Sequence, residues 1–149
     1  MSTTEKILNR WRIHRDVLLE LVKVFPQSEG DYRPTAEVMS VKELIHHIAA
    51  TPEFFFASIE EREMNIPPVP ETLQQTIELL EKLTIEHRAI IQQYSEEDLL
   101  VEKTILFFNK TEPIEEILQR LITHEAHHKG QLMLYARLLH LEPPFYTIY

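Results

Sequence analysis

Cysteine is missing altogether from this sequence of 149 residues. Its absence excludes disulfides, thiolate metal ligands and a cysteine nucleophile within the chain. Long hydrophobic runs are missing too, and the stretch from Met1 to Arg12 alternates charged with apolar residues. We therefore expect neither a signal peptide nor a membrane span, and the sequence predicts a cytoplasmic protein.

Glycine and clustered positive charge are also scarce. Two glycines stand against nine prolines, which disfavours turn-rich β architectures and favours long helices separated by proline-marked breaks. The formal net charge is −9, and no cluster of lysines and arginines offsets it. Because an acidic surface repels phosphate groups, we expect no nucleic acid partner and no attachment to anionic membranes.

Apolar residues recur at helical spacing in four stretches, residues 4–25, 40–65, 72–94 and 111–140. None of these stretches is apolar all round, so the four helices must cover one another's apolar faces. The sequence thus predicts an all-α protein, with a single four-helix bundle domain over residues 1–149.

Local signals refine these helices. Ser40 and Glu43 fit a capping box at the start of the second helix, and Pro52 should kink that helix. Thr111 is the expected N-cap of the fourth helix, with Pro113 in its first turn. Residues 101–109 are rich in β-branched and aromatic side chains, so an extended segment or short hairpin is expected before the last helix.

Two of the eight histidines stand out by position. His124 and His128 lie on the apolar stripe of the last helix and are four residues apart, so their rings can point at a common atom. The alternative is a pair of core histidines hydrogen-bonded to separate neighbours. Burying two polar rings without a shared partner is costly, which favours a metal ion.

A third ligand should come from another helix, and periodicity leaves several candidates. His47 lies on the flank of the apolar face of the second helix, whereas His46 is expected to be solvated and His127 points off the core face. His14 and His87 lie on the apolar stripes of their helices. Each is a fourth ligand, a support for a ligand or a packed histidine bonded to a carbonyl, and we favour the last role.

The segment His124–His128 also matches H-E-x-x-H, in which two histidines bind zinc and the glutamate is the general base of a peptidase. The longer version of that motif fails, because Leu134 occupies the position of the third histidine and Gly130 is out of step. We therefore disfavour a metallopeptidase. Glu125 remains a candidate base, the alternative being a buried carboxylate paired with a histidine or lysine.

Two segments resemble signatures of the DinB/YfiT-like family, which is unrelated to the DNA polymerase that shares the DinB name. His124–Leu132 resembles the fourth-helix signature, H-x-x-x-H followed by a basic residue, glycine and glutamine. Ser40–Ile48 resembles the second-helix signature, in which the ligand histidine follows the serine by seven residues. That register selects His47 over His46.

The resemblance implies a four-helix bundle with a three-histidine metal site, often assembled as a homodimer. It assigns His47, His124 and His128 as the ligands. Relatives include thiol-dependent transferases that use bacillithiol or mycothiol, and a maleylpyruvate isomerase. Zinc, nickel, manganese and iron all accept three imidazoles, so the ligand type does not select the metal.

Three functions follow, because three neutral histidines leave a metal position open to water or substrate. The first is a transferase that activates a low-molecular-weight thiol as its small-molecule substrate. The second is a hydrolase that uses a metal-bound water, with Glu125 as base. The third is a metal-binding or stress-response protein without turnover.

Further residues carry narrower expectations. Gln131 is expected either to hydrogen-bond a ligand ring or substrate, or to be an amide at a helix interface. Tyr135 is expected in the core. The apolar tail Pro143–Tyr149 is expected to pack on the bundle or across a dimer interface.

Overall fold

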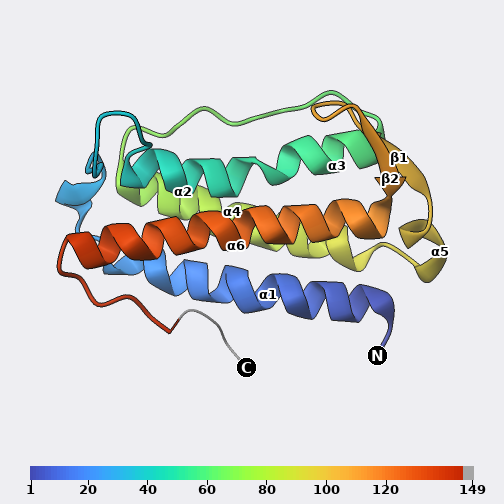
Figure 1. Cartoon of the computed structure of the whole chain (residues 1–149), viewed down its shortest axis with the longest axis horizontal. Coiled ribbons are helices and arrows are strands. Elements are labelled where there is room, and N and C mark those ends of the chain that lie inside the picture. The colour runs from blue at the N-terminus through green and yellow to red at the C-terminus, as the bar shows by residue number, and fades with distance from the viewer. Residues whose placement is uncertain (146–149) are drawn as a thin grey trace.

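The computed structural model of the chain describes residues 1–145 and shows long helices lying side by side (Figure 1). Two 3₁₀ turns, Val22–Val24 and Gln27–Glu29, follow the first helix. The remaining elements, in chain order, are α1 Thr3–Leu21, α2 Val41–Ala50, α3 Pro52–Glu60, α4 Leu73–Gln92, α5 Glu96–Leu99, β1 Glu102–Ile105, β2 Lys110–Pro113 and α6 Ile114–Leu138. With α2 and α3 counted as one broken helix, the predicted all-α four-helix bundle is confirmed.

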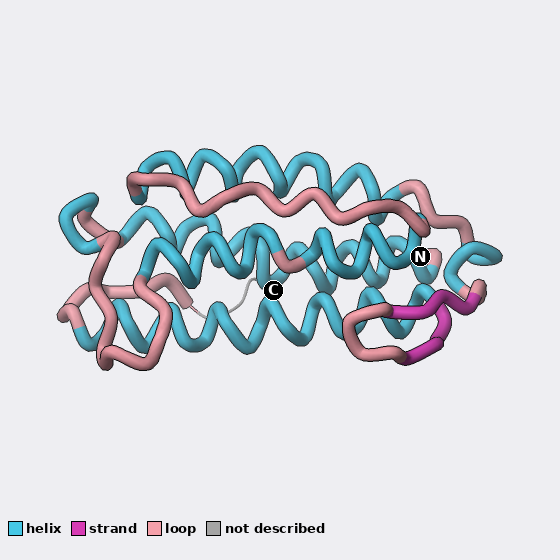
Figure 2. Tube along the Cα trace, turned by 90° about the horizontal axis from the view of Figure 1, so that it is seen from above, coloured by secondary structure: helices cyan, strands magenta, loops and turns pink. Residues whose placement is uncertain are grey.

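The order of the helices depends on one long connection. Residues 61–72 run back along the length of the bundle, so α3 and α4 point in the same direction (Figures 1 and 2). The helices α1 and α6 point the other way (Figure 1). This crossover places α6 against both α1 and α2, and these contacts build the site described below.

Capping boxes start three of the long helices. The side chains of Ser2, Ser40 and Thr72 each accept a hydrogen bond from the backbone N–H three residues later. The side chain of that later residue bonds back to the backbone of the cap, which satisfies two free N–H groups at each helix start. The box predicted at Ser40 is thus confirmed.

The disruption predicted at Pro52 is present, but it is a break rather than a kink, since α2 ends at Ala50 and α3 begins at Pro52. Proline has no N–H to give to the preceding turn, which interrupts the helical ladder there. The break leaves Thr51 as the last residue of the first half, where its backbone N–H bonds to the carbonyl of His47 at 3.0 Å. One turn of helix therefore joins the break to a candidate ligand.

The segment before the last helix is a hairpin, as predicted, but it extends further than expected. β1 and β2 pair antiparallel from Glu102 with Pro113 to Ile105 with Lys110. Thr111 therefore lies in a strand, where its hydroxyl bonds that of Thr104 at 2.8 Å. The prediction of Thr111 as N-cap was wrong, because cross-strand pairing takes that residue and α6 begins only at Ile114.

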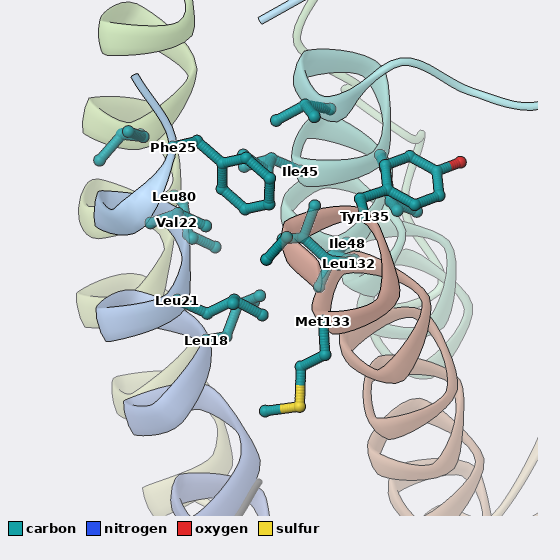
Figure 3. Close-up of a cluster of buried hydrophobic side chains, with 14 of the residues drawn as sticks. Leu18, Leu21, Val22, Phe25, Ile45, Ile48, Leu80, Leu132, Met133 and Tyr135 are labelled. Carbon is teal, nitrogen blue, oxygen red and sulfur yellow. The ribbon is translucent and has the colours of Figure 1, made fainter. Parts of the chain in front are cut away.

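The core consists of two apolar clusters separated by a polar layer. One cluster contains Leu18, Leu21, Leu132 and the predicted core residue Tyr135, whose hydroxyl donates to the carbonyl of Met39 (Figure 3). The other cluster surrounds Trp11 near the hairpin. Between them, along α1, α4 and α6, lie the buried polar side chains of Arg15, Thr84, His87, Glu125 and Lys129.

No helix within residues 1–145 is both long and apolar enough to cross a membrane. The packing predicted for Pro143–Tyr149 falls mostly outside the described residues, and within them Phe145 is 65% exposed.

Candidate metal centre

Three histidine rings from two helices meet at one point. His47 on α2 places its Nε2 atom 3.0 Å from Nε2 of His124 and 3.1 Å from Nε2 of His128, both on α6. The three donor atoms all lie within 4.8 Å of one another, and each residue is half-buried. The structure thus brings together the three residues that the sequence and the family resemblance selected.

The donor atoms have the separation that a shared metal requires. Two imidazole nitrogens bound to one ion at about 2.0–2.1 Å lie about 2.8–3.4 Å apart for ligand angles between 90° and tetrahedral. The observed distances of 3.0 and 3.1 Å fall in that range. Three neutral nitrogen donors suit zinc, nickel, manganese and iron, so the residues fit a divalent metal of unspecified identity.

Neighbouring groups orient two of the rings. Nδ1 of His128 lies 2.6 Å from the amide oxygen of Gln131, an arrangement in which Nδ1–H donates. The hydroxyl of Thr51 donates to the carbonyl of His47 at 2.6 Å, and its oxygen lies 3.4 Å from Nδ1 of the same histidine. With the proton on Nδ1, each Nε2 carries a lone pair toward the shared point.

The electrostatics of the cluster keep these rings neutral. Burial, together with the neighbouring imidazoles of His128 and His47, lowers the pKa of His124 to about 4. Burial also lowers the pKa values of His47 and His128, with a contribution from neighbouring histidines. A metal needs unprotonated imidazoles, so this environment favours the binding-competent form at neutral pH.

The other histidines do not join the cluster. His127 is exposed, as predicted. The prediction that His46 is solvated was wrong, since its Nε2 lies 2.7 Å from the carbonyl of Pro67 and the ring is half-buried. The crossover loop causes this, because it passes over α2 and covers His46.

His14 and His87 pack against other residues, but within residues 1–145 neither has the carbonyl partner predicted for it. Nδ1 of His14 pairs with the ammonium of Lys129 at 3.1 Å. Nδ1 of His87 lies 3.4 Å from the guanidinium of Arg15, and its ring packs against Phe56. Burial, together with the positive charge of Arg15, lowers the pKa of His87 to about 3. His87 therefore belongs to the buried polar layer, and His14 is a half-buried ring at its edge.

The carboxylate of Glu125 forms a buried ion pair with the guanidinium of Arg15. Its two oxygens accept from Nε and Nη2 of that arginine at 2.5 and 2.9 Å, and the side chains are 2% and 0% exposed. The predicted burial is confirmed, but the partner is an arginine rather than a histidine or lysine. Sequence reasoning missed Arg15, although it lies four residues after Trp11 on the apolar stripe of α1.

An apolar pocket of about 270 Å³ adjoins two of the histidines. It lies between the α2–α3 break and the hairpin, and no Asp, Glu, Lys or Arg is among its lining residues in the described chain. The lining is His47, Thr51, Phe54, Phe55, Ile105, Phe107, Phe108 and His124. A molecule in this pocket would contact His47 and His124 as well as the aromatic rings of α3 and the hairpin.

Comparisons of sequence place the chain among known proteins. The DinB family model matches residues 1–148. The protein is 32% identical to the uncharacterized protein YjoA of Bacillus subtilis strain 168 over 153 aligned positions, which cover 98% of this chain and 97% of YjoA.

Comparisons of structure agree with this placement. The crystal structure of YjoA superposes with a TM-score of 0.77 at 29% identity, covering 95% of this chain and 97% of YjoA. A DinB-like protein from Bacillus cereus ATCC 10987 gives a TM-score of 0.84 at 19% identity, with 97% of each chain covered. YfiT from Bacillus subtilis superposes with a TM-score of 0.71 at 16% identity, covering 93% of this chain and 89% of YfiT. YfiT is described as a probable metal-dependent hydrolase with an unusual four-helix bundle topology. Because the family model spans almost the whole chain, the protein belongs to the DinB family.

Proposed function

We propose that the protein is a metal-dependent enzyme in which His47, His124 and His128 hold one divalent ion. Its first candidate reaction is transfer of a low-molecular-weight thiol of the bacillithiol type to an electrophilic small molecule. A metal at this point would lower the pKa of a bound thiol or water and leave a position open beside the three imidazoles.

The observation that carries this proposal is the pocket that adjoins His47 and His124. A closed structural site would need no cavity at its donor atoms, whereas a catalytic site needs room for a reacting molecule. The apolar lining excludes water from one side of the cluster, which strengthens electrostatic interactions at the donor end.

The environment of Glu125 favours thiol transfer over hydrolysis. In transfer, the thiol sulfur forms a bond to carbon, the bond to the leaving group breaks, and the leaving group departs with the electron pair. The thiol proton passes to solvent, so no buried base is needed. Hydrolysis by a bound water benefits from a base within reach. The proposed base, Glu125, directs both oxygens to Arg15.

Hydrolysis is the second candidate, because a metal held by the three histidines would also lower the pKa of a bound water. The likeness to YfiT is at 16% identity, so it bears on the fold and not on the reaction. A metal-binding role without turnover is the third candidate.

We also propose that the chain acts in the cytoplasm and that it forms a homodimer. Light scattering on the purified protein would test the dimer.

The proposal is tested with protein loaded with zinc, nickel, manganese or iron in turn. Each sample is assayed for conjugation of bacillithiol to a fluorogenic alkylating agent, and for hydrolysis of a panel of esters and amides. Metal-dependent conjugation that is absent in His128→Ala supports the transferase. Ester or amide hydrolysis with the same dependence supports the hydrolase, and stoichiometric metal without either activity supports the binding role.

A further inference from the structure

Two exposed phenylalanines at the hairpin tip form one wall of the pocket beside the histidines. Phe107 and Phe108 lie in the turn between β1 and β2 and are 74% and 53% exposed. Large apolar side chains left this open at a pocket mouth are typical of a surface that a ligand covers. The neighbouring Leu106 is 78% exposed and does not line this pocket.

The opposite wall is also aromatic. Phe54 on α3 lies 5.8 Å from Phe107 between ring centroids, and Phe55 lies 6.4 Å from Phe108. Phe107 and Phe108 themselves meet edge to face, with centroids 5.0 Å apart and planes at 81°. These separations are those at which aromatic rings attract one another. Because the paired rings already touch, a ligand ring would lie beside these pairs, against their free faces and edges, and not between the members of a pair.

The size and polarity of the pocket narrow the class of ligand. A dry cavity of about 150 Å³ binds benzene, so a volume of about 270 Å³ accommodates one aromatic ring with a short substituent. Among the described lining residues, the one hydroxyl belongs to Thr51, and it donates its proton to the carbonyl of His47. At the aromatic end, the described lining residues therefore offer no side-chain partner for a charged or strongly polar group.

We propose that this pocket is the subsite for an aryl group of the substrate, with Phe107 and Phe108 as specificity-determining residues. Calling that group part of a substrate rests on the proposed function, but binding of the ring does not. The substituent would extend toward His47 and His124, which places the reacting atom of the molecule at the donor end. A second copy of the chain is a poorer occupant, because the cavity continues past the exposed tip to Phe55, which is 4% exposed.

The test uses 4-fluorobenzyl alcohol as probe and the full chain after removal of metal by a chelator. Binding is followed by the fluorine NMR signal of the probe, and its position by nuclear Overhauser contacts with the ring protons of His47 and His124. We expect saturable binding that Phe108→Ser weakens by about tenfold or more. Leu106→Ser, a matched loss of an exposed apolar side chain in the same turn, should leave the affinity within about twofold of the wild type. Phe107→Ser is the second test variant and should also weaken binding.

Three results would overturn the inference: no saturable binding to the wild type, equal weakening by Leu106→Ser, or histidine contacts that are absent at saturation. If light scattering shows instead that Phe108→Ser dissociates a dimer while the probe never binds, the tip is an interface between copies. The metal content of the protein decides the proposed function separately. If the protein binds the probe but no metal, the aryl subsite is supported and the proposed metal-dependent enzyme is rejected. If it binds metal but not the probe, the aryl subsite is rejected and the proposed enzyme is not.

Discussion

Arg15 of α1 and Glu125 of α6 form a buried ion pair with two contacts, directly beside the helix turn that carries two of the candidate ligands. The contacts measure 2.5 and 2.9 Å, and Nη1 of Arg15 also donates to the hydroxyl of Thr84 at 3.0 Å. Removing one partner of such a pair leaves the other charge buried without compensation. The pair therefore fixes how α6 lies against α1 and α4.

We predict that Glu125→Gln lowers the free energy of unfolding by about 3–5 kcal/mol, because it leaves the guanidinium of Arg15 unpaired in the core. Urea denaturation of the metal-free protein measures this. The control is Glu81→Gln, which removes an exposed partner of Lys23 and should cost about 0–1 kcal/mol. If the two variants lose similar free energy, the buried pair has no special role in stability.

Gln131 should matter for metal affinity and little for stability. Its amide oxygen holds the Nδ1–H of His128 at 2.6 Å, while the side chain itself is exposed. Loss of a group that orients a ligand costs about 10–100-fold in metal affinity. We expect Gln131→Ala to show that loss in a chelator competition with an unchanged melting temperature. Gln131→Glu, which keeps an acceptor oxygen, should recover the affinity, and failure to do so would remove the orienting role.

Thr51 offers a second test of ligand orientation, at His47. Thr51→Val keeps the shape of the side chain but removes the oxygen that faces Nδ1 of His47. We expect a weaker metal affinity, with a smaller change than in Gln131→Ala because the distance of 3.4 Å is long for a hydrogen bond. Thr51→Ser keeps the hydroxyl and should behave like the wild type. Isothermal titration with the preferred metal would compare the three proteins.

The metal-free protein should lose stability as the pH falls from about 6.5 toward 4.5. Burial lowers the pKa of His87 to about 3 in the folded chain, so the unfolded chain takes up a proton in this range and the folded chain does not. One such group contributes a slope of up to about 1.4 kcal/mol per pH unit. His14, His47, His124 and His128 act in the same direction, because their folded pKa values are also lowered.

The variant His87→Leu isolates one member of this set. Its unfolding free energy should depend less steeply on pH than that of the wild type between pH 6.5 and 4.5, as measured by urea denaturation at several pH values. The variant Ile85→Ala is the control, since it shortens an exposed apolar side chain on the same helix and removes no titratable group. Parallel pH profiles for wild type and His87→Leu would show that His87 is protonated as readily in the folded chain as in the unfolded one.

Periodicity was sufficient for the parts of the site that lie on one helix. His124 and His128 share a face because a helix repeats every 3.6 residues, so their proximity follows from the chain alone. The capping box at Ser40 and the break at Pro52 are equally local, and both are present. The identity of the third histidine was different, because apolar stripes allowed several candidates and only the family resemblance selected His47.

The features of the site that could not be predicted from the sequence depend on contacts between segments far apart in the chain. The aromatic pocket forms where the hairpin packs against α3. The sequence around Phe107 and Phe108 contains no local pattern that predicts this contact. The burial of His46 depends on the crossover loop. The partner of Glu125 lies 110 residues away on α1, and helical spacing alone does not say which helices adjoin.

Elemental analysis of untagged protein, beside the His128→Ala variant, tests the central claim most directly. Three convergent imidazoles predict about one equivalent of divalent metal per chain in the wild type after reconstitution, and a large loss of it in the variant. Absence of metal from both samples, even after reconstitution with zinc, nickel, manganese and iron, would contradict the account. The three inward histidines would then be structural, and the proposed enzyme would have to be abandoned.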